Sequence, residues 1–486
     1  MKLIITEKPS VAQDIAKAYS NPQRKDGYIE TGEYSITWAF GHLIEISKLN
    51  APPRWDLNNL PILPGDFTYD VVKDKHKQFN TIKHLLSRSQ EVVIATDSGR
   101  EGELIARLIL KLSSWKNWDN TFRFWSSQAL SEQVVKAEMR NLKPAGNYDS
   151  LYFSALARQQ SDWLCGINLT QLISLRSGRG QVWSVGRVQT PTLALIVQRD
   201  RLRKEFVKEE YYLIKAQFLA KDQQYTGIYK FGELPDEQPG QDKEDVVNPK
   251  KILKKELAEK VFADVQGSES GTIKLIKKED KQEVPPLLHS LTSLQQEANR
   301  VHGFSASRTL DLAQALYETY KVISYPRTES QHLGESGKEM AKNVLVLLSK
   351  MDLVQEVDKV GKRVFDDSKL TDHHALIPLQ TLNSRLSEDE RKIYILIARK
   401  FTGAFMPLYK FQKTTLITEI KEHEFVSTGT TVSQWGWKAL YKEDKTTEEL
   451  LPNVVEGEAV KKEHVDMEQK LTQPPSAFNE SSLLKR

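Results

Sequence analysis

Two apolar runs in the first third of the chain are each followed by an acidic turn and a helical pattern. Lys2 to Thr6 form the first run, and VAQDIAKAY after Pro9 has the apolar spacing of a helix, whose first turn tolerates proline. Val92 to Thr96 form the second run, Asp97 to Gly102 the turn, and an amphipathic helix starts at Leu104. Strand, turn and helix repeated in this way predict an α/β unit with a mostly parallel sheet.

The rest of the chain alternates between helical and β patterns. The apolar spacing is helical from about Asn147 and changes near Lys204 to two alternating β segments. A polar stretch from Gly232 to Lys255 predicts a loop or an insertion. Two helices with a break at Gly303 follow, then further helices up to Leu408 and a second β region. The two β regions would most simply pair in one domain that the chain enters twice.

The composition excludes several classes of protein. With 486 residues, 39% hydrophobic and 28% charged, the chain is predicted to form about three or four globular domains. Its net charge of +4 requires any surface that binds nucleic acid to arise from local clustering. The single cysteine, Cys165, excludes a disulfide framework and a zinc site of several thiolates, which favours a reducing compartment. No apolar run reaches about 18 residues, so we expect a cytoplasmic protein without a membrane span.

Acidic residues stand at the predicted carboxyl ends of the two strands. They are Glu7, Asp97, Glu101 and Glu103. Ligands of open α/β sheets collect at these ends, and carboxylate oxygens suit Mg²⁺ in contact with phosphate. Acidic residues also favour helix N-termini because of the helix dipole. With Lys8 and Arg100 beside them, a site that handles phosphate and ordinary helix capping are equally supported.

The segment VISYPRTES places a tyrosine, Tyr325, between a short apolar run and Pro326. Proline restricts the backbone on both sides, so the phenol and Arg327 keep a set relationship. A guanidinium can stabilise a phenolate and grip a phosphate oxygen. These groups suit nucleophilic attack on a phosphodiester. The alternative is a buried tyrosine at a strand end beside a surface arginine.

Two aromatic or basic positions in the first third have open interpretations. His42 follows Gly41 at a strand-to-turn junction, where a single histidine is more often structural than catalytic. Trp55 lies beside Arg54 in a proline-rich loop, where it either stacks on an unpaired base or caps the sheet.

A second group of candidates lies in the helical region. Arg158 and Asp162 are four residues apart and share a helix face, which by default is a surface ion pair. Before a new helix near Pro191, the chain offers small and polar residues that form either a cradle for a phosphate backbone or an ordinary loop and helix cap. These residues are Ser184, Gly186, Arg187, Gln189 and Thr190.

Taken together, these segments resemble the type IA DNA topoisomerases, most closely the bacterial topoisomerase III branch. The motifs, in family order, are IITEKPSVA, TWAFGHL, ATDSGREGELIA, ARQQSDWLCGINLT, SVGRVQTPTL, LTSLQQEANRVHGFSASRTL, ISYPRTES and DHHALIP. The resemblance implies a multidomain α/β plus α plus β fold, in which a Toprim α/β domain, a β-ribbon arch and helical domains form a torus. It implies a Toprim domain at 1–148, a helical domain that binds single strands at 149–204 and 465–486, a β arch at 205–284 and 408–464, and a helical domain with the catalytic tyrosine at 285–407.

The resemblance also implies roles for individual residues. Tyr325 would attack one DNA strand and hold its 5′ phosphate, Arg327 would contact that phosphate, and His373 would assist. Glu7 would be a proton donor or metal ligand, and Lys8 would position the phosphate. Mg²⁺ would be held by Glu7, Asp97 and Glu101. The residues expected at single-stranded DNA are Trp55, Arg158, Gly166, Ser184, Val185, Gly186, Arg187, Val188 and Gln189, together with Arg327.

The expected function is cleavage of one DNA strand, passage of another and resealing, which would relax negative supercoils or decatenate. The phosphotyrosine conserves bond energy, so no nucleotide cofactor is expected. Partners would be single-stranded or negatively supercoiled DNA in the bacterial cytoplasm, and the protein would be a monomer. Two departures from the family pattern are Gly99, which replaces the middle Toprim aspartate, and the end of the chain at Arg486, from which we expect an incomplete single-strand-binding domain. One alternative is a shortened relative that binds single strands without turnover. A second is a Toprim nuclease or primase, but neither of these two enzymes explains SYPRTES.

Overall fold

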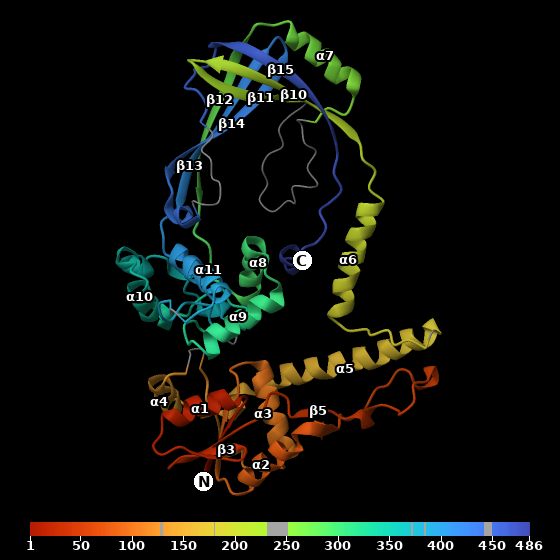
Figure 1. The fold of residues 1–486 in the computed structure, drawn as a ribbon, viewed down its shortest axis with the longest axis vertical. Coiled ribbons are helices and arrows are strands. Elements are labelled where there is room, and N and C mark those ends of the chain that lie inside the picture. The colour runs from red at the N-terminus through yellow and green to blue at the C-terminus, as the bar shows by residue number, and fades with distance from the viewer. Residues whose placement is uncertain (127–129, 179, 231–250, 371–372, 383–384, 442–449) are drawn as a thin grey trace. The chain divides into compact units, whose positions relative to one another are not determined.

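The computed structural model describes residues 1–126, 130–178, 180–230, 251–370, 373–382, 385–441 and 450–486 (Figure 1). The chain packs as two compact units. The first comprises Met1–Leu195, Leu287–Phe401 and Glu480–Arg486, and the second comprises Ile196–Pro286 and Thr402–Asn479. No helix of the described residues is long and apolar enough to cross a membrane.

A seven-stranded sheet organises the N-terminal part of the first unit, with the order β2-β3-β4-β1-β7-β8-β9. Strand β1 (Lys2–Thr6) runs parallel to β4 (Tyr34–Trp38) and to β7 (Glu91–Ala95), and β8 (Thr121–Arg123) runs parallel to β7. The carboxyl ends of these strands therefore share one edge, which confirms the predicted parallel core. The outer pairings are antiparallel and involve β2 (Gln23–Lys25), β3 (Tyr28–Glu30) and β9 (Lys143–Pro144).

Helices cover both faces of this sheet because the central strands alternate buried side chains to either side. Leu3 and Ile5 pack with residues of α2 (His76–Ser87) and α3 (Arg100–Leu112). Ile4 packs with residues of α1 (Pro9–Lys17) and α4 (Glu132–Arg140) on the other face. Apolar side chains on both faces are typical of parallel strands. A separate hairpin pairs β5 (Ile44–Ile46) with β6 (Tyr69–Val71).

Helix α3 begins at Arg100, four residues before the predicted start at Leu104, so Glu101 lies in its first turn. Gly99 precedes the helix with φ 178°, an extended conformation that any residue adopts. Gly102 is required for a different reason, because a Cβ atom there would lie 2.1 Å from the carbonyl oxygen of Asp97. The start of α3 therefore packs directly on the backbone of Asp97. The long helix α5 (Asp149–Ser177) packs along α3.

The segment that carries Tyr325 lies in a helical part of the first unit. Helices α8 (Leu291–His302) and α9 (Ala306–Glu318) are separated by Gly303, whose φ of 69° ends α8 and confirms the predicted break. Ile323 forms an isolated bridge with Pro378, and the backbone N–H of Ser324 donates to Ile377 at 3.0 Å. The remaining helices of this part are α10 (Lys338–Leu347), α11 (Glu388–Ala404) and the short α12 (Glu480–Leu484), which packs on α8.

The second unit is a closed barrel with the strand order β10-β11-β14-β13-β12-β15. Its strands are β10 (Glu210–Ala220), β11 (Gln223–Tyr229), β12 (Ser270–Glu283), β13 (Tyr409–Ile420), β14 (His423–Gln434) and β15 (Ala459–Leu471). The two β regions of the sequence therefore pair in one domain, as predicted. Helix α7 (Lys255–Gln266) packs on the barrel, and α6 (Gln189–Lys204) precedes it in the chain.

One predicted boundary is wrong. Strand β15 pairs with β10 as far as Leu471, so residues 465–471 belong to the barrel and not to the helical domain. Val465 and Met467 continue the alternating pattern and contact the barrel core, which explains why the strand does not stop at 464. Of the polar stretch predicted to be a loop, residues 232–250 lie outside the described residues.

Candidate active site

A cavity of about 460 Å³ lies at the carboxyl edge of the sheet. Glu7 follows β1, Asp97 follows β7, and Glu101 comes from the first turn of α3. From the helical part of the same unit, the segment around Tyr325 reaches this edge. The polar side chains that line the cavity include Glu7, His42, Asp97, Glu101, Arg158, Tyr325, Arg327 and His373.

The phenol of Tyr325 contacts the acidic edge directly. Its hydroxyl donates to Asp97 Oδ2 at 3.2 Å, and its ring lies 4.4 Å from the ring of His373. Burial raises the pKa of Tyr325 far above its usual value, and the carboxylates of Asp97 and Glu7 add to the shift, while Arg327 opposes it. The phenol is therefore neutral at physiological pH, and a group that accepts its proton is already in contact.

The carboxyl groups of the cavity differ in their electrostatics. Burial, followed by repulsion from Asp97, raises the pKa of Glu7 to about 7, and Lys8 opposes the shift. The pKa of Glu101 is lowered, chiefly by a hydrogen bond with His42 Nε2 at 3.0 Å. Two carboxyl groups with different pKa values can serve as acid and base in one site. His42, which the sequence favoured as a structural residue, thus lies in the cavity against Glu101.

Lys8 is shared between the sheet and the helical part. Its ammonium lies 2.6 Å from Glu318 at the end of α9 and 3.8 Å from Asp97 Oδ2. Burial opposes its charged form, but Asp97 and Glu318 more than offset this and the pKa of Lys8 is raised. A second ion pair, between Lys321 and Asp14, joins the same two parts. The sequence carried no signal for Glu318, because its helix position is that of an ordinary polar residue.

Carboxylate oxygens are the donor type that a divalent cation prefers, but the carboxylates of the cavity are not arranged around a common position. Among the described residues, no group of three His, Cys, Asp or Glu side chains is arranged to hold a metal ion. Asp97 contacts Tyr325 and Lys8, and Glu101 contacts His42. Burial raises the pKa of Glu7 and repulsion from Asp97 adds to the shift; a bound cation would relieve that repulsion. The donor set therefore fits Mg²⁺ once these protein contacts are exchanged.

Glu103, the fourth acidic residue noted in the sequence, does not belong to the site. Its side chain is fully buried and accepts from Arg107 Nε at 2.9 Å and from Arg123 Nε at 2.8 Å. Arg123, also fully buried, in turn donates to the carbonyl oxygen of Asp97 at 2.7 Å. Glu103 thus holds the arginine that supports the end of β7. Helical periodicity explains this, because Glu103 and Glu101 lie on different faces of α3.

Trp125, which no motif singled out in the sequence, lies beside the cavity against His373. It follows β8 at the same edge of the sheet, and its ring lies 6.1 Å from that of His373 with 19° between the planes. Burial lowers the pKa of His373 to about 3, so its imidazole is neutral. The rule that picked out Glu7 and Asp97 would have found Trp125, had β8 been recognised as a parallel strand.

The loop expected to contact DNA lies along α5. The backbone N–H of Val185 donates to Thr170 at 3.0 Å, and a Cβ atom on Gly166 would lie 3.9 Å from the carbonyl oxygen of Val185. The side chain of Gln189 donates to Ser184 at 2.9 Å, and the N–H of Gly186 donates to Thr190 at 3.1 Å. Two of the N–H groups considered for a phosphate cradle therefore already have partners. Val188 is 63% exposed.

The predicted pair of Arg158 and Asp162 is secondary to another contact. Asp162 lies 2.6 Å from Arg187 Nε but 3.8 Å from Arg158 Nε. Arg158 lines the cavity and helps to lower the pKa of Glu101, after His42 and Arg327. Trp55 is 40% exposed and is not among the described residues that line the cavity.

The chain is similar to known proteins along its length. The profile of the DNA topoisomerase family matches residues 146–486, and that of the Toprim domain matches residues 2–128. DNA topoisomerase 3 of Bacillus cereus is 34% identical over 505 residues, and that of Bacillus subtilis is 33% identical over 504. Each alignment covers 99% of this chain and 66% of the relative, so the chain spans just under two thirds of their length.

A solved structure has the same fold. Full-length topoisomerase I from Thermotoga maritima superposes with a TM-score of 0.73 at 24% identity, covering 99% of this chain and 74% of that one. The family profile spans the helical part, the barrel and Tyr325, and the Toprim profile spans the strands that carry Glu7 and Asp97. The chain therefore belongs to the DNA topoisomerase family, with an N-terminal Toprim domain and the type IA fold.

Proposed function

We propose that this protein cleaves one strand of DNA through Tyr325, lets another strand pass and reseals the break, as a topoisomerase III-like isomerase. The observation that carries the proposal is the contact between the Tyr325 hydroxyl and Asp97, in a cavity that also holds Glu7 and Arg327. The family membership and the identity to DNA topoisomerase 3 proteins support it. The task would be relaxation of negative supercoils or decatenation.

The cleavage step exchanges one phosphodiester for another. The phenolic oxygen of Tyr325 bonds to phosphorus while the bond from phosphorus to the 3′ oxygen breaks, which leaves a 5′-phosphotyrosine and a free 3′ hydroxyl. The phenolic proton passes to Asp97, which already accepts its hydrogen bond. Because the number of phosphodiester bonds is unchanged, the reverse reaction reseals the strand without a nucleotide cofactor.

Glu7 would give a proton to the departing 3′ oxygen. Its pKa of about 7 keeps a substantial protonated fraction at neutral pH, whereas an ordinary carboxyl would be ionised. Glu7 therefore serves as general acid in cleavage and as general base in resealing. This assignment separates the two carboxyl groups by role: Asp97 would take the proton of the nucleophile, and Glu7 would give a proton to the leaving group.

Positive charge for the phosphate comes from Arg327 and Lys8. Arg327 is exposed at the cavity, where its guanidinium can bind two phosphate oxygens. Lys8 is held by Glu318, so a phosphate that enters must compete with that carboxylate. His373 is neutral in this conformation and would contribute an N–H donor and not a charge. Donors and charges fixed in advance around the reacting phosphate usually contribute more to catalysis than any other single effect.

Mg²⁺ is the proposed cofactor. Asp97 and Glu101 would hold it, together with Glu7 when Glu7 is ionised and is not acting as the proton donor, in keeping with the Toprim domain. When bound, it would neutralise phosphate charge beside the cavity. Gly99 supplies no further carboxylate, so we expect weaker metal binding than in relatives with an aspartate there.

Single-stranded DNA would approach along α5. Arg158 extends the cavity in this direction, and the loop from Ser184 to Gln189 lies against the same helix with Arg187 at its centre. Here Arg187 is 46% exposed and pairs with Asp162, so phosphate contact would require exchange of that pair. Trp55 is exposed for stacking on a base.

The test is a search for the covalent intermediate. Protein is mixed with a labelled single-stranded oligonucleotide and quenched with detergent, and adducts are separated by electrophoresis. We expect an adduct from the unchanged protein and none from Tyr325→Phe, which should still bind the oligonucleotide. Tyr317→Phe is the matched control, because this neighbouring ring packs on Tyr325 and lies outside the reaction.

The outcomes separate the candidate functions. Binding without an adduct would favour a protein that only holds single strands, and would reject the proposal. An adduct that survives Tyr325→Phe would reject the nucleophile. Relaxation of negatively supercoiled plasmid then distinguishes cleavage alone from the full cycle.

A further inference from the structure

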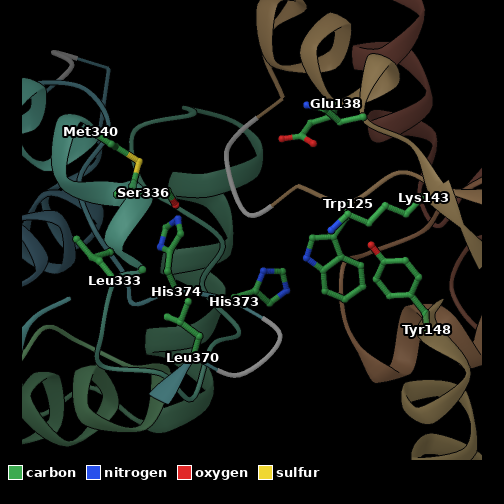
Figure 2. A pocket seen from close by; sticks show the side chains of 13 residues that line it. Trp125, Glu138, Lys143, Tyr148, Leu333, Ser336, Met340, Leu370, His373 and His374 are labelled. Carbon is green, nitrogen blue, oxygen red and sulfur yellow. The ribbon is translucent and has the colours of Figure 1, made fainter. Parts of the chain in front are cut away.

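A second cavity, of about 650 Å³, adjoins the active site across His373, which lines both cavities (Figure 2). Such a volume lies within the range of about 300–1,000 Å³ typical of small-ligand sites. One wall comes from the sheet domain and carries Trp125, Glu138, Lys143 and Tyr148, and the other comes from the helical part and carries Leu333, Ser336, Met340, Leu370, His373 and His374. The reaction described above uses none of these residues except His373.

The wall next to the active site is a series of flat rings. Tyr148 stacks on Trp125 with centroids 4.9 Å apart and 19° between the planes, and the Trp125 and His373 rings make the same angle at 6.1 Å. His373 in turn lies 4.4 Å from the ring of Tyr325. Figure 2 shows His373 pointing from the helical part toward Trp125, with open space beside the rings. Aromatic side chains beside a phosphate-binding site can stack on unpaired bases, and here a base would take the place of Tyr148 or His373 against Trp125.

The rest of the lining suits the edge and the back of a base. Leu333, Met340 and Leu370 provide apolar surface on the wall opposite Trp125. Glu138 and Lys143 offer an acceptor and a donor at the sheet side. His374 Nε2 is buried, and none of the described residues hydrogen-bonds to it. A ligand with a planar aromatic body and a polar rim would satisfy all of these groups.

We propose that this second cavity binds the base of the nucleotide that becomes joined to Tyr325, the first nucleotide on the 3′ side of the break. This inference rests on the proposed cleavage reaction and goes beyond it. The helical part that carries Tyr325 also supplies one wall of the cavity, through residues that follow Tyr325 in the chain, so the nucleotide attached to Tyr325 stays beside that wall. The other side of the active cavity, toward Arg158, is left for the strand that ends in the free 3′ hydroxyl.

The arrangement has a consequence for resealing. A base in the cavity would touch Trp125 of the sheet domain while its phosphate is bonded to Tyr325 of the helical part. It would therefore add a contact between the two parts in addition to the Lys8–Glu318 and Lys321–Asp14 ion pairs. Loss of the base should weaken this closed arrangement of the cleaved complex.

The experiment uses an oligonucleotide whose cleavage position has been mapped. An abasic residue is placed at the first nucleotide on the 3′ side of the break, and the covalent adduct is measured at limiting protein concentration. With the unchanged protein we expect the abasic residue to lower adduct yield about tenfold, as for the loss of one stacked base. Trp125→Ala should lower the yield from the intact oligonucleotide by a similar factor, and the abasic residue should then have no further effect. Trp125→Phe should restore most of the difference in adduct yield between the intact and the abasic oligonucleotide.

A second variant and a fluorescence measurement keep the test valid if Trp125→Ala fails to fold. Ser336→Trp places a bulky ring in the cavity from the exposed opposite wall, and should reproduce the effect of Trp125→Ala without touching the stack. In Tyr325→Phe, 2-aminopurine at the same nucleotide should be quenched on binding, and Ser336→Trp should remove the quenching. An abasic residue four nucleotides farther along serves as the control and should affect all variants alike.

The outcomes are distinct from those of the cleavage test. If no adduct forms with the intact oligonucleotide, the cleavage proposal fails and this inference falls with it. If adducts form but the abasic and intact oligonucleotides give equal yields, the base site alone is rejected. Additive effects of Trp125→Ala and the abasic residue would also reject it, because the two changes would then act at separate places.

Discussion

Glu103 offers a sharp test of how the acidic residues are divided between structure and chemistry. It lies two positions from Glu101 in α3, yet its carboxylate is fully buried between Arg107 and Arg123. Glu103→Gln keeps the shape of the side chain and removes its charge. Arg107 retains Asp149 at 2.9 Å, but Arg123 loses the carboxylate that compensates its burial. Burial already lowers the pKa of Arg123, and Glu103 opposes that shift.

The magnitude follows from the burial of Arg123, whose side chain has no exposed surface. Removal of one partner from a buried ion pair costs about 3–5 kcal/mol, because the remaining charge is left uncompensated. For a domain of this size, each kcal/mol lowers the melting temperature by about 2–4 °C. Glu103→Gln should therefore lower the melting temperature of the sheet domain by roughly 10 °C.

Differential scanning calorimetry at one scan rate measures this shift. Glu101→Gln is the matched control, because its side chain is 69% exposed and its only ion pair is with His42 among the described residues, so we expect a change of about 2 °C or less. A Mg²⁺ titration of adduct resealing should give the reverse ranking. Glu101→Gln should need more Mg²⁺ for resealing than the unchanged protein, and folded Glu103→Gln should need the same amount. Equal melting temperatures for the two variants would refute the assignment of Glu103 to the framework.

Three further predictions concern charge and metal. The pKa of Glu7 is about 7 in the folded protein and 4.5 ordinarily, so the stability of the folded protein falls as pH rises from 4.5 through 7. Without Mg²⁺, Glu7→Gln should therefore raise the melting temperature at pH 8 and not at pH 4. An equal effect at both pH values would contradict this. For Glu297 the pKa shift has the opposite sign, because His289 and Lys400 outweigh burial and lower the pKa to about 2. Glu297→Gln should therefore lower the free energy of unfolding by roughly 3 kcal/mol at neutral pH. Urea titrations should show this loss shrinking as pH falls from 4.5 toward 2. Gly99→Asp should lower the Mg²⁺ needed for resealing, since the backbone there is extended and accepts any residue; an unchanged titration would show that position 99 does not reach the metal.

Much of the framework around the site is encoded locally. Apolar periodicity is a property of neighbouring residues, so β1, the start of α1 and the break at Gly303 follow directly from the chain. Because the carboxyl ends of parallel strands share one edge of the sheet, Glu7 and Asp97 could be predicted to lie together there. The order of the motifs along the chain indicated the family. The helix start at Arg100 and the end of β15 at Leu471 were missed, because capping and cross-strand pairing depend on partners distant in sequence.

The tertiary structure decided which side chains meet. Glu101 and Glu103 look alike in the sequence, but the helix turns one toward His42 and buries the other against Arg123. Glu318 reaches the site from a helix whose sequence carries no chemical signal, and Trp125 follows β8, a strand of three residues that the sequence pattern did not reveal. The sequence by itself determined the central strands β1 and β7 and most of the helices, since these depend on local pattern, and it singled out Tyr325 as the candidate nucleophile. The distance from the Tyr325 hydroxyl to Asp97, and the ring stack beside it, are set by packing between segments about 230 residues apart, which no local pattern encodes.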